Sequence, residues 1–244
     1  MILIFRKFVP IVFLFFAGCA TLEPYVQDLN FISVTQEREL STQIETEIQK
    51  EMVVVTDPEV NRYVQSIGEG LTAQLPRRDF DYRFRVVEDK TPNAFTIPGG
   101  AIYVHTGLLQ MTDRNELAGV LGHEIGHAYA RHPAKLISRE YGVEYLSQLI
   151  FGKQQGKMRN IMLSLAKGGI LSRYNQQDEY RADEIGFALL RRAGLPTRGL
   201  LSFLGKIQRL GSGAPIPFLS SHPPTPARMA RLEAMERGQL VPTI

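Results

Sequence analysis

The chain has 244 residues, of which 44% are hydrophobic, 22% charged and 9% aromatic. This balance is typical of a folded globular protein and excludes disordered, collagen-like and coiled-coil chains. Without residues 1–18, which hold no acidic residue, 26 basic residues face 25 acidic ones, so the charge gives no sign of a nucleic-acid-binding surface. The single cysteine excludes an intramolecular disulfide.

Residues 1–18 are predicted to be a secretory signal peptide. Arg6 and Lys7 precede a short apolar run, which is far from the roughly 20 residues needed to span a bilayer. The lone cysteine, Cys19, ends the stretch Phe-Ala-Gly-Cys, which resembles the lipobox of bacterial lipoproteins, although phenylalanine stands where leucine is usual. We therefore expect lipidation of Cys19. The alternative is an ordinary signal peptide with an incidental cysteine.

This N-terminal sequence predicts the location of the protein. A lipid on Cys19 would anchor the chain to a membrane of the bacterial cell envelope, facing the periplasm, with residues 19–34 as a tether. Ala20 stands where an aspartate would favour retention at the inner membrane, so the outer membrane is expected. Residues 35–244 are expected to form a single domain.

Two helices are predicted at the start of this domain. Residues 35–52 are mainly polar but carry apolar side chains at a spacing of four, which marks one helical face. Asp57 and Pro58 indicate the N-cap and first turn of a second helix, which we expect to end before Pro76.

Three short segments then predict a small sheet. Residues 82–87 alternate apolar and polar side chains of types that favour strands. Residues 94–97 and 101–105 flank a Pro-Gly-Gly turn, which indicates a hairpin. Since most of the chain after Leu108 is predicted to be helical, we expect an α+β fold, mostly helical with a small antiparallel sheet of about three strands.

The most specific motif is His-Glu-Ile-Gly-His, on a helix predicted over residues 115–131. His123 and His127 lie one turn apart and about 40° apart around the helix axis, so both imidazoles can bind one metal ion. Glu124, about 100° from His123 around the axis, flanks the ion and is suited to act as general base on water. The alternative is two histidines on an ordinary buried helix.

The predicted third metal ligand is Glu179, on a helix over residues 175–192. Its carboxylate would complete a His-His-Glu set and leave the fourth position open for water. Asp183 lies one turn later on the same face, where it is suited to accept a ring N–H from a ligand histidine and fix its tautomer. The alternative for both residues is a solvated helix face.

Two further histidines and a glycine-containing stretch carry weaker signals. His132 precedes Pro133, where the helix must end, and is suited to interact with the helix C-terminus; a metal role is the alternative. His105 lies on the third predicted strand, where a structural role is expected. Residues 152–157 lack the spacing of a Walker motif, so no nucleotide site is predicted.

These motifs together resemble those of the HtpX/BepA-type zinc metallopeptidases, gluzincins that also include the CAAX prenyl endopeptidase. The resemblance covers about residues 36–231 and rests on the following stretches: Asp57–Val64, Pro92–Gly100, Tyr103–Leu109, Asn115–His132, Glu179–Asp183 and Ser221–Pro223. The chain has no predicted transmembrane span and no room for a helical-repeat domain, so it resembles the stand-alone lipoprotein branch.

The resemblance implies a zincin-like fold that holds one zinc ion per chain. The implied ligands are His123, His127 and Glu179, and the implied general base is Glu124. The same family uses an asparagine on the edge strand, here Asn93, to bind the substrate backbone.

His222 and Arg228 are implied to lie in the cleft, where they would stabilise the oxyanion of the tetrahedral intermediate. Alternatively, His222 would occupy the fourth position at zinc in a resting state. Thr225 and Pro226 indicate a helix that runs to about Gly238. Arg228 falls near the positive end of that helix dipole, which suggests an anionic or carbonyl partner.

The sequence thus predicts a zinc endopeptidase of the bacterial envelope that cleaves unfolded or misassembled proteins. Its expected partners are those protein substrates and a membrane reached through the N-terminal lipid, with no nucleic acid and no nucleotide. An extended substrate would add a strand to the sheet edge near residues 93–106. Two alternatives stay open: a chaperone-like outer-membrane assembly factor with a silenced or secondary metal site, and a metal-binding structural protein without turnover.

Overall fold

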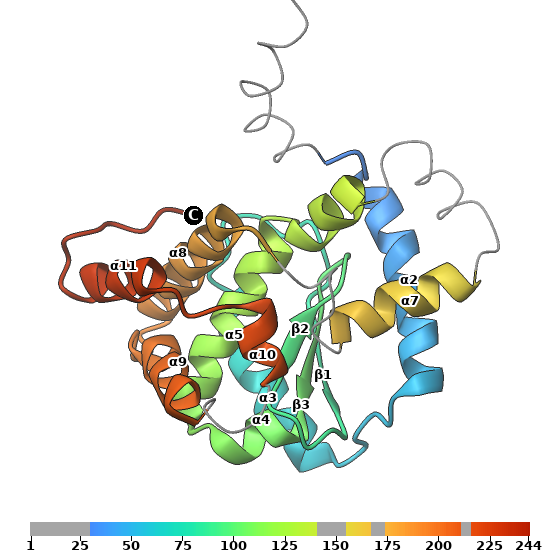
Figure 1. The fold of residues 1–244 in the computed structure, drawn as a ribbon, viewed down its shortest axis with the longest axis horizontal. Helices are drawn as coiled ribbons and strands as arrows, with labels where there is room; N and C mark the ends of the chain where they lie inside the picture. The colour runs from blue at the N-terminus through green and yellow to red at the C-terminus, as the bar shows by residue number, and fades with distance from the viewer. Residues whose placement is uncertain (1–29, 141–154, 167–173, 211–215) are drawn as a thin grey trace, which may run out of the picture.

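The structure, a computed structural model, describes residues 30–140, 155–166, 174–210 and 216–244. The predicted signal peptide, Cys19 and most of the predicted tether lie outside these ranges. Within them, no helix is both long and apolar enough to cross a bilayer. Figure 1 shows a small central sheet with helices on both of its faces. The expected α+β fold, mostly helical around a small sheet, is confirmed.

The two N-terminal helices form where the sequence predicts them. Helix α2 (Val34–Glu51) begins with a capping box, in which Ser33 and Gln36 each bond the other's backbone N–H. Helix α3 (Pro58–Thr72) begins at Asp57, whose carboxylate accepts hydrogen bonds from two backbone amides of the first turn. Both begin within one residue of the predicted position, because capping side chains determine helix starts.

The sheet has three strands in the order β1-β3-β2: β1 (Arg83–Val87), β2 (Ala94–Thr96) and β3 (Ala101–His105). β2 and β3 form the expected antiparallel hairpin. β1, however, pairs with β3 in parallel. The prediction of a purely antiparallel sheet is therefore wrong, and the sheet is mixed.

The loop over residues 88–93 explains this arrangement. It carries the chain from the end of β1 to the start of β2 across the end of β3, so that β3 lies between the two. The carbonyl of Asp89 accepts hydrogen bonds from the Thr106 hydroxyl (2.9 Å) and the Gly107 amide (2.8 Å). A Cβ on Gly107 would lie 2.2 Å from the carbonyl oxygen of Lys90, so only glycine allows the loop this close. Strand patterning alone cannot reveal such a crossing.

The bounds of the remaining helices are as follows: α4 Thr106–Met111, α5 Arg114–Tyr129, α7 Gln155–Ala166, α8 Gln176–Arg192, α9 Gly199–Leu210, α10 Pro217–Ser221 and α11 Pro226–Glu236.

The sheet separates two apolar clusters, because alternate side chains of each strand point to opposite faces. One cluster, which includes Phe84, Ile102 and Val104, packs against α3, α5, α8, α9 and α11. The other, which includes Phe95 and Tyr103, packs against α2 and α7 (Figure 1).

Helices α5 and α8 approach one another closely enough for backbone to touch backbone. A Cβ on Gly126 of α5 would lie 2.5 Å from the carbonyl oxygen of Ala182 on α8. A Cβ on Gly186 of α8 would lie 2.8 Å from the carbonyl carbon of Gly122 on α5. Both distances are shorter than a carbon side chain allows, so the glycines determine how near the two helices come.

We expect Gly126→Ala to destabilise the protein by about 1–3 kcal/mol, because the added methyl group forces α5 and α8 apart. The matched control is Gly70→Ala on α3, where the added methyl group meets nothing within 4 Å. That change should stabilise the protein by about 0.4–1 kcal/mol through the unfolded chain. Chemical denaturation of both variants measures the difference, and equal effects would contradict the packing argument.

Candidate metal centre

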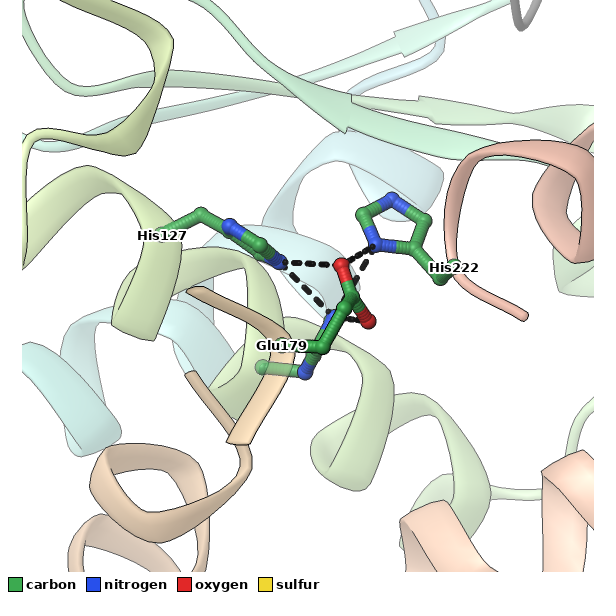
Figure 2. Close-up of side chains that lie close together, drawn as sticks. His127, Glu179 and His222 are labelled. Carbon is green, nitrogen blue, oxygen red and sulfur yellow. Dashed lines mark hydrogen bonds and ion pairs between the residues drawn. The ribbon is translucent and has the colours of Figure 1, made fainter. Parts of the chain in front are cut away.

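Four buried side chains converge between α5, α8 and α10. His123 and His127 come from α5, Glu179 from α8, and His222 follows the last residue of α10. One donor atom from each lies within 4.8 Å of all the others, and this is the set of potential metal donors found among the described residues. Figure 2 shows the carboxylate of Glu179 between the rings of His127 and His222.

The distances between these donors suit a tetrahedral metal site. His123 Nε2 lies 3.0 Å from His127 Nε2 and 3.1 Å from His222 Nδ1. The Glu179 carboxylate oxygens lie 2.9–3.5 Å from the same three nitrogens. Donors bound at about 2.0–2.1 Å in a tetrahedron are about 3.3–3.4 Å apart. The three predicted ligands therefore fit one metal ion, and His222 lies at the fourth corner.

Glu124 lies beside this donor set and is completely buried. The hydroxyl of Thr96, on β2, lies 2.8 Å from Glu124 Oε2 and 3.0 Å from its backbone carbonyl oxygen. The other carboxylate oxygen, Oε1, has no hydrogen-bond partner and lies 3.4 Å from His222 Nε2. The edge strand therefore holds one oxygen of Glu124 and leaves the second one directed at the donor set.

Asp183 and Arg228 form a buried ion pair behind the donors. Asp183 Oδ1 lies 2.9 Å from His123 Nδ1, where it accepts the ring N–H. Arg228, only 1% exposed, donates to both oxygens of Asp183 at 2.6 and 2.8 Å. It also contacts Glu179 Oε2 at 2.6 Å and donates to the carbonyl of His222 at 3.1 Å. The structure thus provides the anionic and carbonyl partners that the helix dipole suggests for Arg228.

Burial and neighbouring charges shift the pKa values of these groups in different directions. Burial, aided by Arg228, lowers the pKa of His123 to about 4, so its ring is neutral. Burial alone would raise the pKa of Glu179, but Arg228 and His222 hold it well below its usual value. Burial alone would lower the pKa of His222, but Glu179 and Glu124 raise it. A neutral imidazole and an ionised carboxylate are the forms that bind metal.

His132 contacts one of the donor histidines, whereas Asn93 and His105 lie at the ends of β2 and β3. Asn93 is buried immediately before β2, and its backbone carbonyl accepts a hydrogen bond from the His105 amide at 3.0 Å. His132 follows α5, and its Nδ1 lies 2.9 Å from His127 Nδ1. Burial and His127 lower the pKa of His132 well below its usual value. Neither His105 nor His132 is among the four donors.

Three features of the site are missing from the sequence interpretation. Thr96, which contacts Glu124, lies in the strand predicted over residues 94–97, and all three residues of the observed strand β2 are buried. Tyr174 stacks on His127, with ring centroids 3.9 Å apart, and no motif in the sequence predicts this contact. Helix α10, which positions His222, lies in residues 211–224, a stretch that the sequence does not predict to be helical; Pro217 in its first turn is the signal that could have revealed it.

We expect Arg228→Gln to lower the free energy of unfolding by about 3–5 kcal/mol, because the change leaves the buried carboxylates of Asp183 and Glu179 without their cation. The matched control is Arg237→Gln, which removes an ion pair with Glu233 at the surface. An exposed pair contributes about 0–1 kcal/mol. Chemical denaturation compares the two, and similar losses would contradict the importance of the buried network.

Comparison with known proteins identifies the family. The profile of peptidase family M48 matches residues 58–236. The metalloprotease YcaL of Escherichia coli is 30% identical over 148 residues, which are 59% of this chain and 58% of YcaL. The beta-barrel assembly-enhancing protease of Escherichia coli is 27% identical over 212 residues, 82% of this chain and 43% of that protein. The mitochondrial metalloendopeptidase OMA1 of Arabidopsis thaliana is 30% identical over 196 residues, 79% of this chain and 40% of that protein.

The chain thus spans between two fifths and three fifths of the length of these relatives. The family match covers helices α5, α8 and α10, which carry the site, and all three strands of the described sheet. It confirms the resemblance to HtpX/BepA-type metallopeptidases on which the sequence interpretation rests. This chain belongs to peptidase family M48.

Proposed function

We propose that the protein is a zinc-dependent endopeptidase of the bacterial cell envelope that cleaves unfolded or misassembled proteins. The observation that carries this proposal is the convergence of His123, His127 and Glu179 beside an oxygen of Glu124 that accepts no hydrogen bond. Two imidazoles and one carboxylate are a ligand set typical of catalytic zinc. One zinc ion per chain is expected.

Zinc bound there would supply a Lewis acid that polarises a peptide carbonyl and acidifies water. Glu124 would accept the proton of the attacking water at Oε1 and later pass it to the leaving amine. The Thr96 hydroxyl holds Oε2, 2.8 Å away, so the carboxylate keeps one orientation while Oε1 takes and releases the proton. Asp183, through His123 Nδ1, keeps the ligand ring in the tautomer that offers Nε2.

The contacts of Arg228 support a positioning role for this residue. Its guanidinium bonds Asp183, Glu179 and the carbonyl of His222, so its donors are directed at the protein itself. Arg228 would therefore act by orienting the Glu179 and Asp183 carboxylates. This role differs from the oxyanion contact that the family resemblance implies.

The position of His222 favours a resting state over an oxyanion contact. Its Nδ1 lies 2.9 Å from Glu179 Oε1 and 3.1 Å from His123 Nε2, at the corner that a substrate carbonyl or water must enter. The ring is 1% exposed and packs against Phe218, with centroids 4.7 Å apart. In such a resting state, His222 would have to move before a substrate binds. This observation also supports the second candidate function, an assembly factor whose metal site is silenced.

Substrate and place of action are proposed from the relatives and the N-terminal sequence. One relative is named for enhancing the assembly of beta-barrels, which suggests envelope proteins as substrates. Lipidation of Cys19 would anchor this chain at the envelope, with the outer membrane preferred. β2 forms one edge of the described sheet, so an extended peptide could pair with it, near Asn93.

Glu124→Gln is expected to retain one zinc ion per chain but to lose the degradation of casein, because it removes only the proton acceptor. Substitution of His123, His127 or Glu179 by alanine should lose the zinc as well. Metal analysis and a casein-release assay on the purified proteins test both points. Full activity of Glu124→Gln would contradict the mechanism, and an inactive, zinc-loaded wild type would favour the assembly factor.

His222→Ala is expected to increase the rate of casein degradation, since it removes the side chain at the fourth corner. The control is Phe218→Leu, which alters the packing of the His222 ring but keeps its nitrogens. A fall of about two orders of magnitude in kcat for His222→Ala would instead assign the oxyanion role. Unchanged activity would contradict both roles.

Cys19→Ser is expected to shift the protein from the membrane fraction to the soluble fraction, or to leave the signal peptide uncleaved, because no thiol remains for the lipid. Fractionation of cells and mass spectrometry of the mature N-terminus measure this. An unmodified N-terminus on the native protein would rule out the lipid anchor.

A further inference from the structure

The ring of His127 has two nitrogens with different neighbours. Nε2 faces the donor set, 3.0 Å from His123 Nε2 and 3.2 Å from Glu179 Oε1. A neutral imidazole that offers the lone pair of Nε2 to a metal carries its proton on Nδ1. Nδ1 of His127 must therefore donate a hydrogen bond to a neighbour on the side away from the metal.

That neighbour is His132. Its Nδ1 lies 2.9 Å from His127 Nδ1, and the side chain is buried. Because His127 Nδ1 is the donor, His132 Nδ1 must accept, and the ring proton of His132 is then on Nε2. His132 Nε2 faces Asp178 Oδ1 at 3.5 Å, and the other oxygen of Asp178 accepts a hydrogen bond from Arg139 at 3.0 Å.

The other ligand histidine is supported by the same kinds of group. His123 Nδ1 faces Asp183, which in turn binds Arg228. In each case a ring N–H is directed toward a carboxylate of α8 that is paired with an arginine. The difference is that the imidazole of His132 lies between His127 and the carboxylate of Asp178.

We infer that His132 is a positioning residue for the metal ligand His127, which it holds in one orientation and one tautomer through a chain that continues to Asp178 and Arg139. This inference rests on the metal site of the proposed function. This role of His132 differs from the two roles that the sequence suggests, a contact with the helix C-terminus and direct metal binding. Its Nδ1 is directed at the nitrogen of His127 that does not face the donor set.

Zinc affinity of the folded protein tests the inference directly. His132→Leu removes the acceptor and should weaken zinc binding about 10–100-fold, the usual effect of losing such a partner. His132→Asn places an amide oxygen near the position of Nδ1 and should restore most of that affinity. The matched control is His105→Leu, which removes another buried imidazole, on β3 and outside the donor set. Its zinc affinity should equal that of the wild type.

Competition between each protein and a chromophoric chelator for added zinc gives the dissociation constants, and circular dichroism verifies folding. Equal zinc affinities of His132→Leu and His105→Leu would overturn the inference. A second measurement needs no variant: nitrogen NMR of histidine-labelled, zinc-loaded wild type should show His132 with its proton on Nε2. A proton on Nδ1 of His132 would also overturn it. A wild type that binds no zinc would instead refute the proposed function, and this inference with it.

Discussion

The contact of two helix backbones determines the geometry of the whole site. α5 carries both ligand histidines and Glu124, and α8 carries Glu179, so the centre exists only while these helices touch. Gly126 and Gly186 permit that approach, because any larger residue would place a carbon inside the van der Waals radius of the opposite backbone. The surrounding apolar cluster packs against α5 and α8, and the glycines determine the distance between these two helices.

Charge is the second constraint, because the site gathers the carboxyl groups of Glu124, Glu179 and Asp183 around Arg228 and His222, all of them buried. Buried charge without compensation is strongly unfavourable, so these groups depend on one another. A divalent cation bound by the donors would add positive charge at the same place. Metal binding and folding stability are therefore expected to be coupled, because the ligands come from several elements.

Local chemistry made much of this structure predictable from sequence. The spacing of four between His123 and His127 predicted their shared face, and Asp57 was predicted as the N-cap at which α3 begins. The order of the strands was not predictable, because a loop that crosses β3 and a simple hairpin connection have similar length and composition. The partners of Thr96 and Arg228 were equally hidden, since they come from elements distant in the chain and no periodicity links them.

The four donors are drawn from residues 123, 127, 179 and 222, which has a consequence for biosynthesis. A nascent chain emerges from its N-terminus, so the first half of the protein leaves the ribosome with two ligands and no means of completing the set. Contacts between residues so distant in sequence form late, after the loops between them have closed. The complete donor set therefore exists only once the chain has folded, so the centre cannot form on a partly synthesised chain.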